Sequence, residues 1–406
     1  MERDSWMIAD LHLHSRFSAA CSKKTTIPLL VKWAKVKGLN LLGTSDFTHP
    51  IWFKEIKELL VEKNGFYYYG DFPFIITGEI SFIYTQGHGR RIHLLILVPS
   101  IEVAEQINSY FDTKGRRDYD GRPIFKISCE QFVKDMREIS KDIEIIPAHI
   151  WTPWFGIFGS KSGFDSLKEA FGVQVEHIHA IETGMSSDPE MNWKIKELDN
   201  KSIVSFSDSH SFWPFRLGRE ATIFKKCDSY KEILRQIREN DFLATIETDP
   251  GYGIYHWDGH RNCGFSCPPS KTRELKGICP KCSRHLTVGV EYRVEELSEH
   301  ERENYKPENA KLFYKLLPLH EIIALQLGVK NMQNVKVWKI YDDLIFKFET
   351  EFNILLHVSK EELLIKKIDN KLIELILKNR KGKIKVKPGF DGEYGKVLME
   401  EKQATL

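Results

Sequence analysis

The stretch MIADLHLHS at residues 7–15 combines a strand signal with two histidines. A strand-like run covers residues 7–12, and His12 and His14 lie two residues apart at its end. Side chains two residues apart on a strand point to the same face. We therefore expect a buried strand whose carboxyl end presents a pair of imidazoles.

Similar apolar runs recur up to about residue 245 and alternate with helical patterns. The predicted strands are 7–12, 39–45, 74–80, 93–98, 143–149, 179–184 and 202–208, with 221–226 as a late addition. The predicted helices are 29–37, between Pro28 and Gly38, and then 128–140, 164–171, 189–199 and 229–239. This alternation, with near-continuous apolar strands, predicts an α/β fold with a mostly parallel sheet covered by helices. Seven repeats favour a distorted barrel over an open sheet.

The length and charge of the chain exclude several classes of protein. Its 406 residues are enough for two or three domains. The 59 Lys and Arg nearly balance the 57 Asp and Glu, so bulk positive charge does not hold this chain to nucleic acid. No apolar run is long enough to span a bilayer, and the N-terminus lacks a signal-peptide core, so we expect a cytoplasmic protein without a membrane partner.

Residues that bind metals or catalyse reactions gather at the ends of the predicted strands. They are His12, His14, Asp46, His49, Glu79, His93, His149, Glu182, Asp208 and His210. An α/β barrel collects its catalytic residues at the carboxyl ends of its strands. Imidazole mixed with carboxylate suits Zn²⁺, Mn²⁺ or Fe, and so many donors exceed what one metal needs.

Clustered metals suit in-line displacement at phosphorus, which predicts a phosphoesterase. Asp208 is the residue on which we expect activity to depend most. Glu182 is predicted to support the ligands or to lie near the substrate, and its alternative role is a charge partner at the barrel rim. The alternative for each histidine is an isolated, hydrogen-bonded core residue, which the matching positions of the whole set disfavour.

Four of the seven cysteines fall within twenty residues, which indicates a metal site in a reducing compartment. Cys263 and Cys267 form one pair, and Cys279 and Cys282 form the second within GICPKC. Four thiolates predict a closed structural zinc site, with His260 as an alternative to one of the cysteines. A module this short depends on its metal for stability.

Sequence features outside the ligand set are compatible with DNA binding. Trp151 and Trp154 lie in an aromatic loop that could stack against an extruded base or simply pack over the barrel end. Arg116 and Arg117 lie in a charged loop at 112–126 that could contact phosphates or be solvated. The pattern becomes helical from about residue 300, first over 312–328 and then to about 379, and 366–387 is strongly basic. We expect three parts: 1–248, a zinc-binding module at 249–300, and a mainly helical, DNA-binding region at 301–406.

The motifs DLHLHS, SDFTHP, GEI, His93, AH at 148–149 and SDSH resemble those of the polymerase-and-histidinol-phosphatase (PHP) superfamily. This resemblance implies a distorted (βα)7 barrel with a trinuclear metal site. The matching ligands are His12, His14, Glu79, His93, His149, Asp208 and His210. His49 matches less closely because Phe47 follows Asp46 where the family has a histidine. The stretch FSAAC at 17–21 lacks a further family ligand, for which Cys21 is the candidate substitute.

Longer strings are similar to the endonuclease Q family over nearly the whole chain. They include HIWTPWFGIFGSKSGFDS (149–166), SFSDSHSFWPFRLGREAT (205–222) and YHWDGHRNC (255–263). The resemblance implies a metal-dependent endonuclease that cuts damaged DNA, double- or single-stranded, on the 5′ side of uracil, hypoxanthine, xanthine or an abasic site. It also implies Zn²⁺ in the cluster and in the structural site, Mg²⁺ or Mn²⁺ for activity, and a sliding clamp as a candidate partner. The alternatives are a small-molecule phosphatase on the same barrel and a DNA-binding module without catalysis.

Overall fold

The computed structural model describes residues 5–299, 302 and 304–398. Their largest sheet contains eleven strands, which follow the order β15-β12-β11-β1-β2-β5-β4-β3, with β6 and β7 paired to β5 and β8 paired to β6. These strands are β1 Trp6–Asp10, β2 Leu41–Gly43, β3 Val61–Lys63, β4 Phe66–Tyr69, β5 Phe72–Gln86, β6 His88–Val98, β7 Ile124–Phe125, β8 Glu144–Pro147, β11 Ala221–Lys225, β12 Ala244–Glu247 and β15 Leu312–Lys315. A parallel pair, β9 Ala180–Glu182 and β10 Ser202–Val204, lies beside it.

The expectation of a mostly parallel sheet is wrong, because the sheet is mixed. Strand β1 runs parallel to β2, and β2 runs parallel to β5. In contrast, β1 pairs antiparallel with β11, and β6 pairs antiparallel with both β5 and β8. The long hairpin of β5 and β6 turns at Gly87, whose φ of 73° is a left-handed conformation that glycine adopts without strain.

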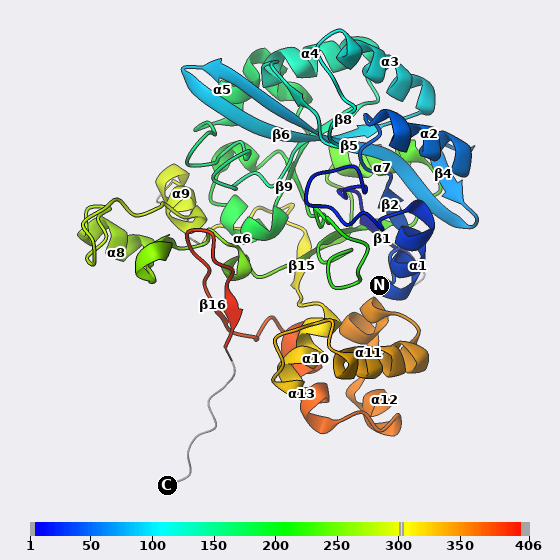
Figure 1. Cartoon of the computed structure of the whole chain (residues 1–406), viewed down its shortest axis with the longest axis vertical. Helices are drawn as coiled ribbons and strands as arrows, with labels where there is room; N and C mark the ends of the chain where they lie inside the picture. The colour runs from blue at the N-terminus through cyan, green and yellow to red at the C-terminus, as the bar shows by residue number, and fades with distance from the viewer. Residues whose placement is uncertain (1–4, 300–301, 303, 399–406) are drawn as a thin grey trace.

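Helices cover the N-terminal sheet, and Figure 1 shows α3 and α4 above the long strands β5 and β6. The helices of this part are α1 Ile27–Lys37, α2 Pro50–Leu59, α3 Ile101–Asp112, α4 Cys129–Ile139, α5 Leu167–Phe171, α6 Pro189–Asn192 and α7 Tyr230–Arg238. The five predicted helices are confirmed, although α5 and α6 are shorter than expected. Pro28 lies in the first turn of α1, and Gly38 ends the helix at a φ of 94°, as the bracketing residues predicted.

The C-terminal part is mainly helical and lies below the sheet in Figure 1, whereas α8 and α9 project to one side. Its helices are α8 Pro269–Glu274, α9 Val290–Leu297, α10 Leu319–Leu327, α11 Val335–Phe348, α12 Lys360–Ile365 and α13 Asn370–Arg380. Two small hairpins complete it, β13 Asp258–His260 with β14 Phe265–Cys267, and β16 Val386–Lys387 with β17 Lys396–Val397. The predicted helix at 312–328 is wrong in its first turn, because 312–315 pair with β12 as strand β15 and the helix starts only after Pro318.

A buried ion pair joins the N-terminal part to the C-terminal helices. Lys37 Nζ at the end of α1 lies 2.7 Å from Glu351 Oε1, and both side chains are buried. Glu351 also accepts hydrogen bonds from Tyr341 Oη and from the backbone N–H of Leu319. Burial opposes ionisation of Lys37 and lowers its pKa, although Glu351 partly offsets this effect.

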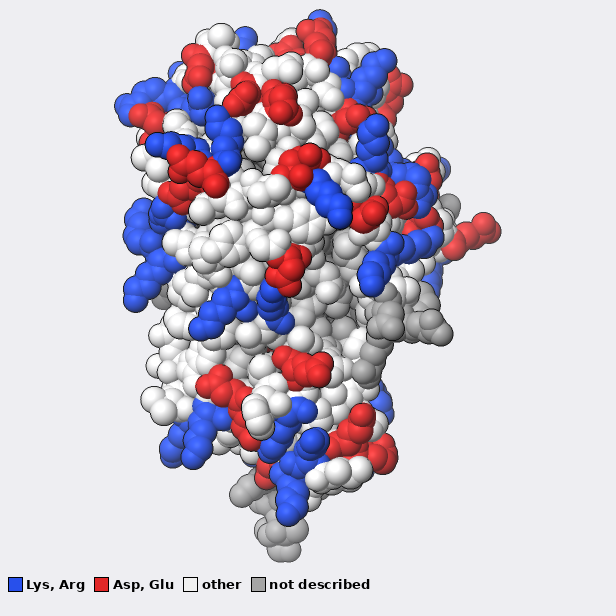
Figure 2. All heavy atoms as spheres, turned by 90° about the vertical axis from the view of Figure 1, so that its right-hand side faces the viewer, with Lys and Arg blue, Asp and Glu red and all other residues white. Residues whose placement is uncertain are grey.

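The distribution of charge on the surface agrees with the balanced charge of the sequence. Figure 2 shows one face on which Lys and Arg are interspersed with Asp and Glu instead of forming a field of one sign. No helix among the described residues has the length and apolarity that a bilayer crossing requires.

Candidate metal centre

The first group of candidate ligands comes from two strand ends and from the middle of a third strand. His12 and His14 follow β1, Asp208 follows β10, and Glu79 lies within β5, and one ligand atom from each lies within 4.8 Å of the others. His14 Nε2 lies 2.9 Å from Asp208 Oδ1 and 3.3 Å from Glu79 Oε2. His12 Nε2 lies 3.6 Å from Asp208 Oδ1 and 3.7 Å from Glu79 Oε1. Two imidazoles and two carboxylates therefore converge on one point.

A second group shares Glu79 with the first. Glu79 Oε1 lies 2.8 Å from His93 Nδ1 and 3.0 Å from His149 Nε2, and these two nitrogens are 3.2 Å apart. His93 opposes Ser81 in the β5–β6 ladder, so it is a diagonal neighbour of Glu79 on the same face. His93 thus reaches the cluster from within an antiparallel strand, and Glu79 faces both groups.

Carboxylates behind the histidines orient their rings. His12 Nδ1 lies 2.9 Å from Glu182 Oε1, and the backbone N–H of His149 donates to Glu182 Oε2 at 2.8 Å. His14 Nδ1 lies 3.1 Å from Asp46 Oδ1. A proton held on Nδ1 by a carboxylate leaves the Nε2 lone pair free for a metal. Glu182 and Asp46 thus contact the candidate ligands His12, His149 and His14, and the role of Glu182 stays a prediction.

The free atoms of the first group fit a cation. His12 Nε2, His14 Nε2 and Asp208 Oδ1 are buried and make no hydrogen bond of good geometry among the described residues, although His14 Nε2 and Asp208 Oδ1 lie 2.9 Å apart. Buried polar atoms are rarely left without a partner, and three that face one another require an explanation. A divalent metal would satisfy all of them, and mixed imidazole and carboxylate ligands suit Zn²⁺ or Mn²⁺.

The electrostatics keep these carboxylates ionised. Burial opposes ionisation of Glu79, but His93 and Arg122 outweigh it and hold the pKa of Glu79 well below its usual range. Burial likewise opposes ionisation of Asp208, but His12 and His14 hold its pKa below the usual range. Both carboxylates are therefore held as anions by the cationic groups that surround them.

Backbone strain is concentrated at the same place. Ser45, Asp46, His149 and Asp208 have φ values of 59°, 36°, 32° and 47°, in the left-handed region that residues other than glycine rarely adopt. All four lie in loops that follow strands of the sheet or of the β9–β10 pair. Such conformations persist only when surrounding contacts enforce them, and they gather at functional sites.

Three residues predicted as ligands or substitutes lie outside both groups. His210 is nearest: its ring centroid lies 4.4 Å from that of His14, and its Nδ1 lies 2.9 Å from the Asp208 carbonyl oxygen. His49 stacks on Phe17 with a centroid separation of 4.2 Å. Cys21 Sγ contacts the His14 carbonyl oxygen, and burial raises the pKa of its thiol. The structure therefore places six candidate ligands and two supporting carboxylates together and leaves His210, His49 and Cys21 beside them.

The cysteine cluster also differs from its predicted composition. The described groups bring His260 together with Cys263, Cys279 and Cys282, all within 4.8 Å. His260 Nδ1 lies 3.4 Å from Cys282 Sγ. Cys267 pairs with Asp258 at the far end of the β13–β14 hairpin, and its Sγ lies 3.3 Å from Thr272 Oγ1. The three-residue gap between Cys263 and Cys267 is occupied by strand β14, which carries the second thiol away from the other ligands.

The predicted DNA-contacting residues differ in their exposure. Trp151 is buried at 1% exposure and donates from Nε1 to Asn192, so in this structure it packs the core and offers no exposed surface. Trp154 is 37% exposed and packs edge-on against Tyr255. Arg116 is exposed and paired with Asp118, whereas Arg117 pairs with Asp112 and donates to the Thr48 carbonyl.

Two residues at the centre were predicted only as members of the charged loop 112–126 and of the aromatic loop, and not among the ligands. Arg122 Nη1 donates to Glu79 Oε2 at 2.9 Å. Phe155 stacks on His93 at 4.1 Å and has a φ of 69°, which is unusual for an aromatic residue. Arg122 lies between Gly121 and Pro123, a turn signal within the charged loop, so its sequence context offered a clue. Phe155 offered none beyond the aromatic loop itself.

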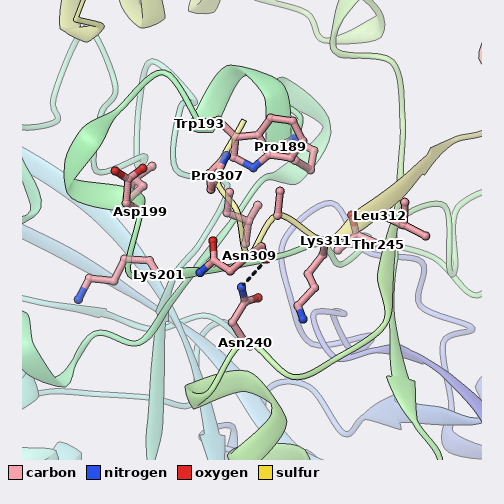
Figure 3. A pocket seen from close by; sticks show the side chains of 13 residues that line it. Pro189, Trp193, Asp199, Lys201, Asn240, Thr245, Pro307, Asn309, Lys311 and Leu312 are labelled. Carbon is pink, nitrogen blue, oxygen red and sulfur yellow. Dashed lines mark hydrogen bonds between the residues drawn. The ribbon is translucent and has the colours of Figure 1, made fainter. Parts of the chain in front are cut away.

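A pocket elsewhere in the molecule contains none of these residues. Figure 3 shows it between the segment that precedes β10 and the segment that leads into β15, with Trp193, Lys201 and Lys311 on its walls. Asn240 Nδ2 donates to the Asn309 carbonyl oxygen there at 3.1 Å. This pocket therefore shares no residue with the candidate metal centre.

Comparisons with known proteins extend over the whole chain. The family model described as the MJ0043 C-terminal domain matches residues 318–383. The protein MJ0043 of Methanocaldococcus jannaschii is 32% identical over 294 residues, which cover 70% of this chain but only 35% of that protein. The protein YqxK of Bacillus subtilis is 27% identical over 411 residues, covering 96% of this chain and 98% of that protein.

Two solved structures match nearly all of the fold. The lesion-specific endonuclease PfuEndoQ of Pyrococcus furiosus superposes with a TM-score of 0.86 and 29% identity, covering 98% of this chain and 96% of that chain. The second structure is a complex of endonuclease Q with a 27-mer duplex that carries an abasic lesion at the active site. It superposes with a TM-score of 0.86 and 30% identity, covering 98% of this chain and 97% of that chain. At this identity and coverage, the chain belongs to the endonuclease Q family.

Proposed function

We propose that this protein is a metal-dependent DNA-repair endonuclease. The observation that carries the proposal is the pair of ligand groups that share Glu79, with three buried ligand atoms that lack partners. The solved relative with an abasic lesion at its active site supports damaged DNA as the substrate. The reaction is hydrolysis of the phosphodiester 5′ to the lesion, which leaves a 3′-hydroxyl and a 5′-phosphate. Uracil, hypoxanthine and xanthine are the proposed further lesions.

The residues that would hold divalent metals are His12, His14, Glu79, His93, His149 and Asp208, with His210 and His49 as outer candidates. Bound there, metal ions supply Lewis-acid stabilisation of phosphate charge and activation of water. We propose Zn²⁺ for part of the cluster and Mg²⁺ or Mn²⁺ for activity. The protein's own contribution is to hold the ligand atoms in place, because Glu182 and Asp46 orient the imidazole rings before substrate arrives.

The proposed fold around this centre is the distorted PHP barrel, which spans residues 1–248. The module at 249–300 would bind a structural zinc through His260, Cys263, Cys279 and Cys282. The backbone N–H groups of Lys281 and Cys282 outweigh the effect of burial and lower the pKa of the Cys279 thiol, which favours the thiolate that zinc binds. The region 301–406 would contact DNA through the basic side chains of 366–387, and β15 attaches this region to the sheet.

Substrate contacts outside the centre are assigned to Trp154 and Arg116, which are exposed, and to Arg117, which is partly buried. Trp154 is the aromatic side chain proposed to stack on a base. Its ring packs edge-on against the ring of Tyr255. Arg116 and Arg117 belong to the loop beside the centre, where phosphate oxygens would compete with Asp118 and Asp112 for their guanidinium groups.

The experiment is a nicking assay with a panel of duplexes. Each duplex carries one abasic site, uracil, hypoxanthine or xanthine, and an undamaged duplex is the control. Wild-type protein with Mg²⁺ or Mn²⁺ should nick immediately 5′ to the lesion, and the Asp208→Ala protein should not. Phosphate release from a small monoester without nicking would instead favour the phosphatase alternative, and DNA binding without hydrolysis would favour the binding-module alternative.

A further inference from the structure

The loop 113–123, which we call the strap, is attached directly to the segments that carry the ligands. The backbone N–H of Gly121 donates to the Phe17 carbonyl at 3.2 Å, and that of Ala19 donates to Asp120 Oδ2 at 3.2 Å. A Cβ at position 121 would lie 2.2 Å from Asp46 Oδ2, so only glycine fits there. The strap is therefore held at the edge of the metal centre.

The strap ends in Arg122, whose side chain reaches the middle of the ligand set. Its Nη1 donates to Glu79 Oε2, and Glu79 is the carboxylate shared by both ligand groups. The arginine side chain is 23% exposed, whereas Glu79 is fully buried. Nη1 of the guanidinium thus faces the ligands, while part of the Arg122 side chain remains accessible from outside. Among the described residues, its side chain has one hydrogen-bond partner, although a guanidinium offers five N–H donors.

We propose that Arg122 is a catalytic residue that contacts the non-bridging oxygens of the scissile phosphate; this inference rests on the proposed function. A planar guanidinium matches two phosphate oxygens and keeps its charge at any working pH. Its donors lie next to the ligands, where negative charge builds up on the phosphate during hydrolysis. The hydrogen bond to Glu79 fixes its orientation before substrate binds. The competing role is purely structural, in which Arg122 only holds Glu79 in place.

The test compares Arg122→Ala with Arg122→Lys and with a control, Arg235→Ala. Arg235 lies on α7 and is paired with three carboxylates, so this control also removes one arginine from a set of ion pairs. The first measurement is the salt dependence of binding to an abasic duplex by anisotropy in Ca²⁺, with the duplex shown to be intact afterwards. Loss of one phosphate contact should reduce the slope of log K against log salt by about 0.9 in Arg122→Ala. The slope should not change in the other two variants.

The second measurement is the single-turnover rate on the abasic duplex and on bis(p-nitrophenyl) phosphate, with metal content measured for each protein. Arg122→Ala should be slower by about 100- to 1,000-fold at unchanged metal content, and Arg122→Lys should lie between it and wild type. An unchanged salt slope, or loss of metal together with activity, would overturn the inference and assign Arg122 the structural role. If wild type hydrolyses only the small diester and Arg122→Ala loses that activity, the inference stands while the proposed DNA-repair function fails.

Discussion

Replacing Glu182 by Gln tests whether the carboxylates behind the histidines prepare the metal centre. Glu182 accepts two hydrogen bonds at once, from His12 Nδ1 at 2.9 Å and from the backbone N–H of His149 at 2.8 Å. A glutamine has one amide oxygen, so it can satisfy one donor while its NH₂ group opposes the other. Changes to such supporting residues cost about 10- to 100-fold in metal affinity, which is about 1.4–2.7 kcal/mol. The unsatisfied buried donor costs a further ~1–3 kcal/mol of folding stability.

The assay is competition with a fluorescent chelator, which gives Zn²⁺ or Mn²⁺ affinity, combined with urea unfolding of the metal-free protein. Glu144→Gln is the matched control, because Glu144 is also buried and lies 3.0 Å from His179 Nδ1 and 2.7 Å from Arg238 Nε. Glu144 lies at the start of β8, whereas His149 follows its carboxyl end. Both variants should lose stability, but only Glu182→Gln should lose metal affinity. Equal metal affinity in the two variants would refute the reasoning.

Three further predictions concern the cysteine cluster and two buried ionisable residues, Glu247 and Lys37. Cys279→Ser should lower the zinc content by one ion per chain while Cys267→Ser retains it, and elemental analysis that finds one ion lost in both variants would restore the four-cysteine site. Burial raises the pKa of Glu247 to about 8. The folded protein therefore keeps a proton that the unfolded chain releases, so urea-measured stability should fall from about pH 4.5 to 8, and Glu247→Gln should flatten that fall. Lys37→Met should leave Glu351 buried and uncompensated and cost about 3–5 kcal/mol in urea unfolding, and a neutral result would show that the ion pair contributes no net stability.

Local patterns predicted the individual strands and helices better than their pairing. The apolar runs and the Pro28–Gly38 brackets locate β1 and α1 within a few residues. Strand direction, however, is set by long-range contacts, and the β5–β6 hairpin depends on Gly87 in TQGHG, a turn signal that the repeating pattern masked. At 312–315 the segment LFYK forms strand β15 by pairing with the free edge of β12. Periodicity alone does not reveal such a partner.

The site was predictable where residue chemistry and strand position agreed. His12, His14, Glu79, His93, His149 and Asp208 were chosen from the sequence, and the structure brings them into two adjacent groups. Contacts between distant segments accompany the positions of Cys267, Trp151 and Arg122, which the sequence did not predict. Asp258 pairs with Cys267 in a hairpin that turns this thiol away, Trp151 is buried through its bond to Asn192, and Arg122 arrives on a strap anchored by Gly121. Such contacts join segments far apart in the chain, so spacing along the sequence could not predict them.

The most direct test of the central claim maps the cut made in a single abasic duplex. Chelator-treated wild-type protein and Asp208→Ala protein are incubated with duplex labelled at either end, without metal and after addition of Mn²⁺. We predict no cut without metal, and with metal a wild-type cut one phosphodiester 5′ to the abasic site, leaving a 3′-hydroxyl, with Asp208→Ala inactive. Cutting that survives chelation, or equal cutting by Asp208→Ala, would contradict the assignment of this centre as the site of DNA hydrolysis.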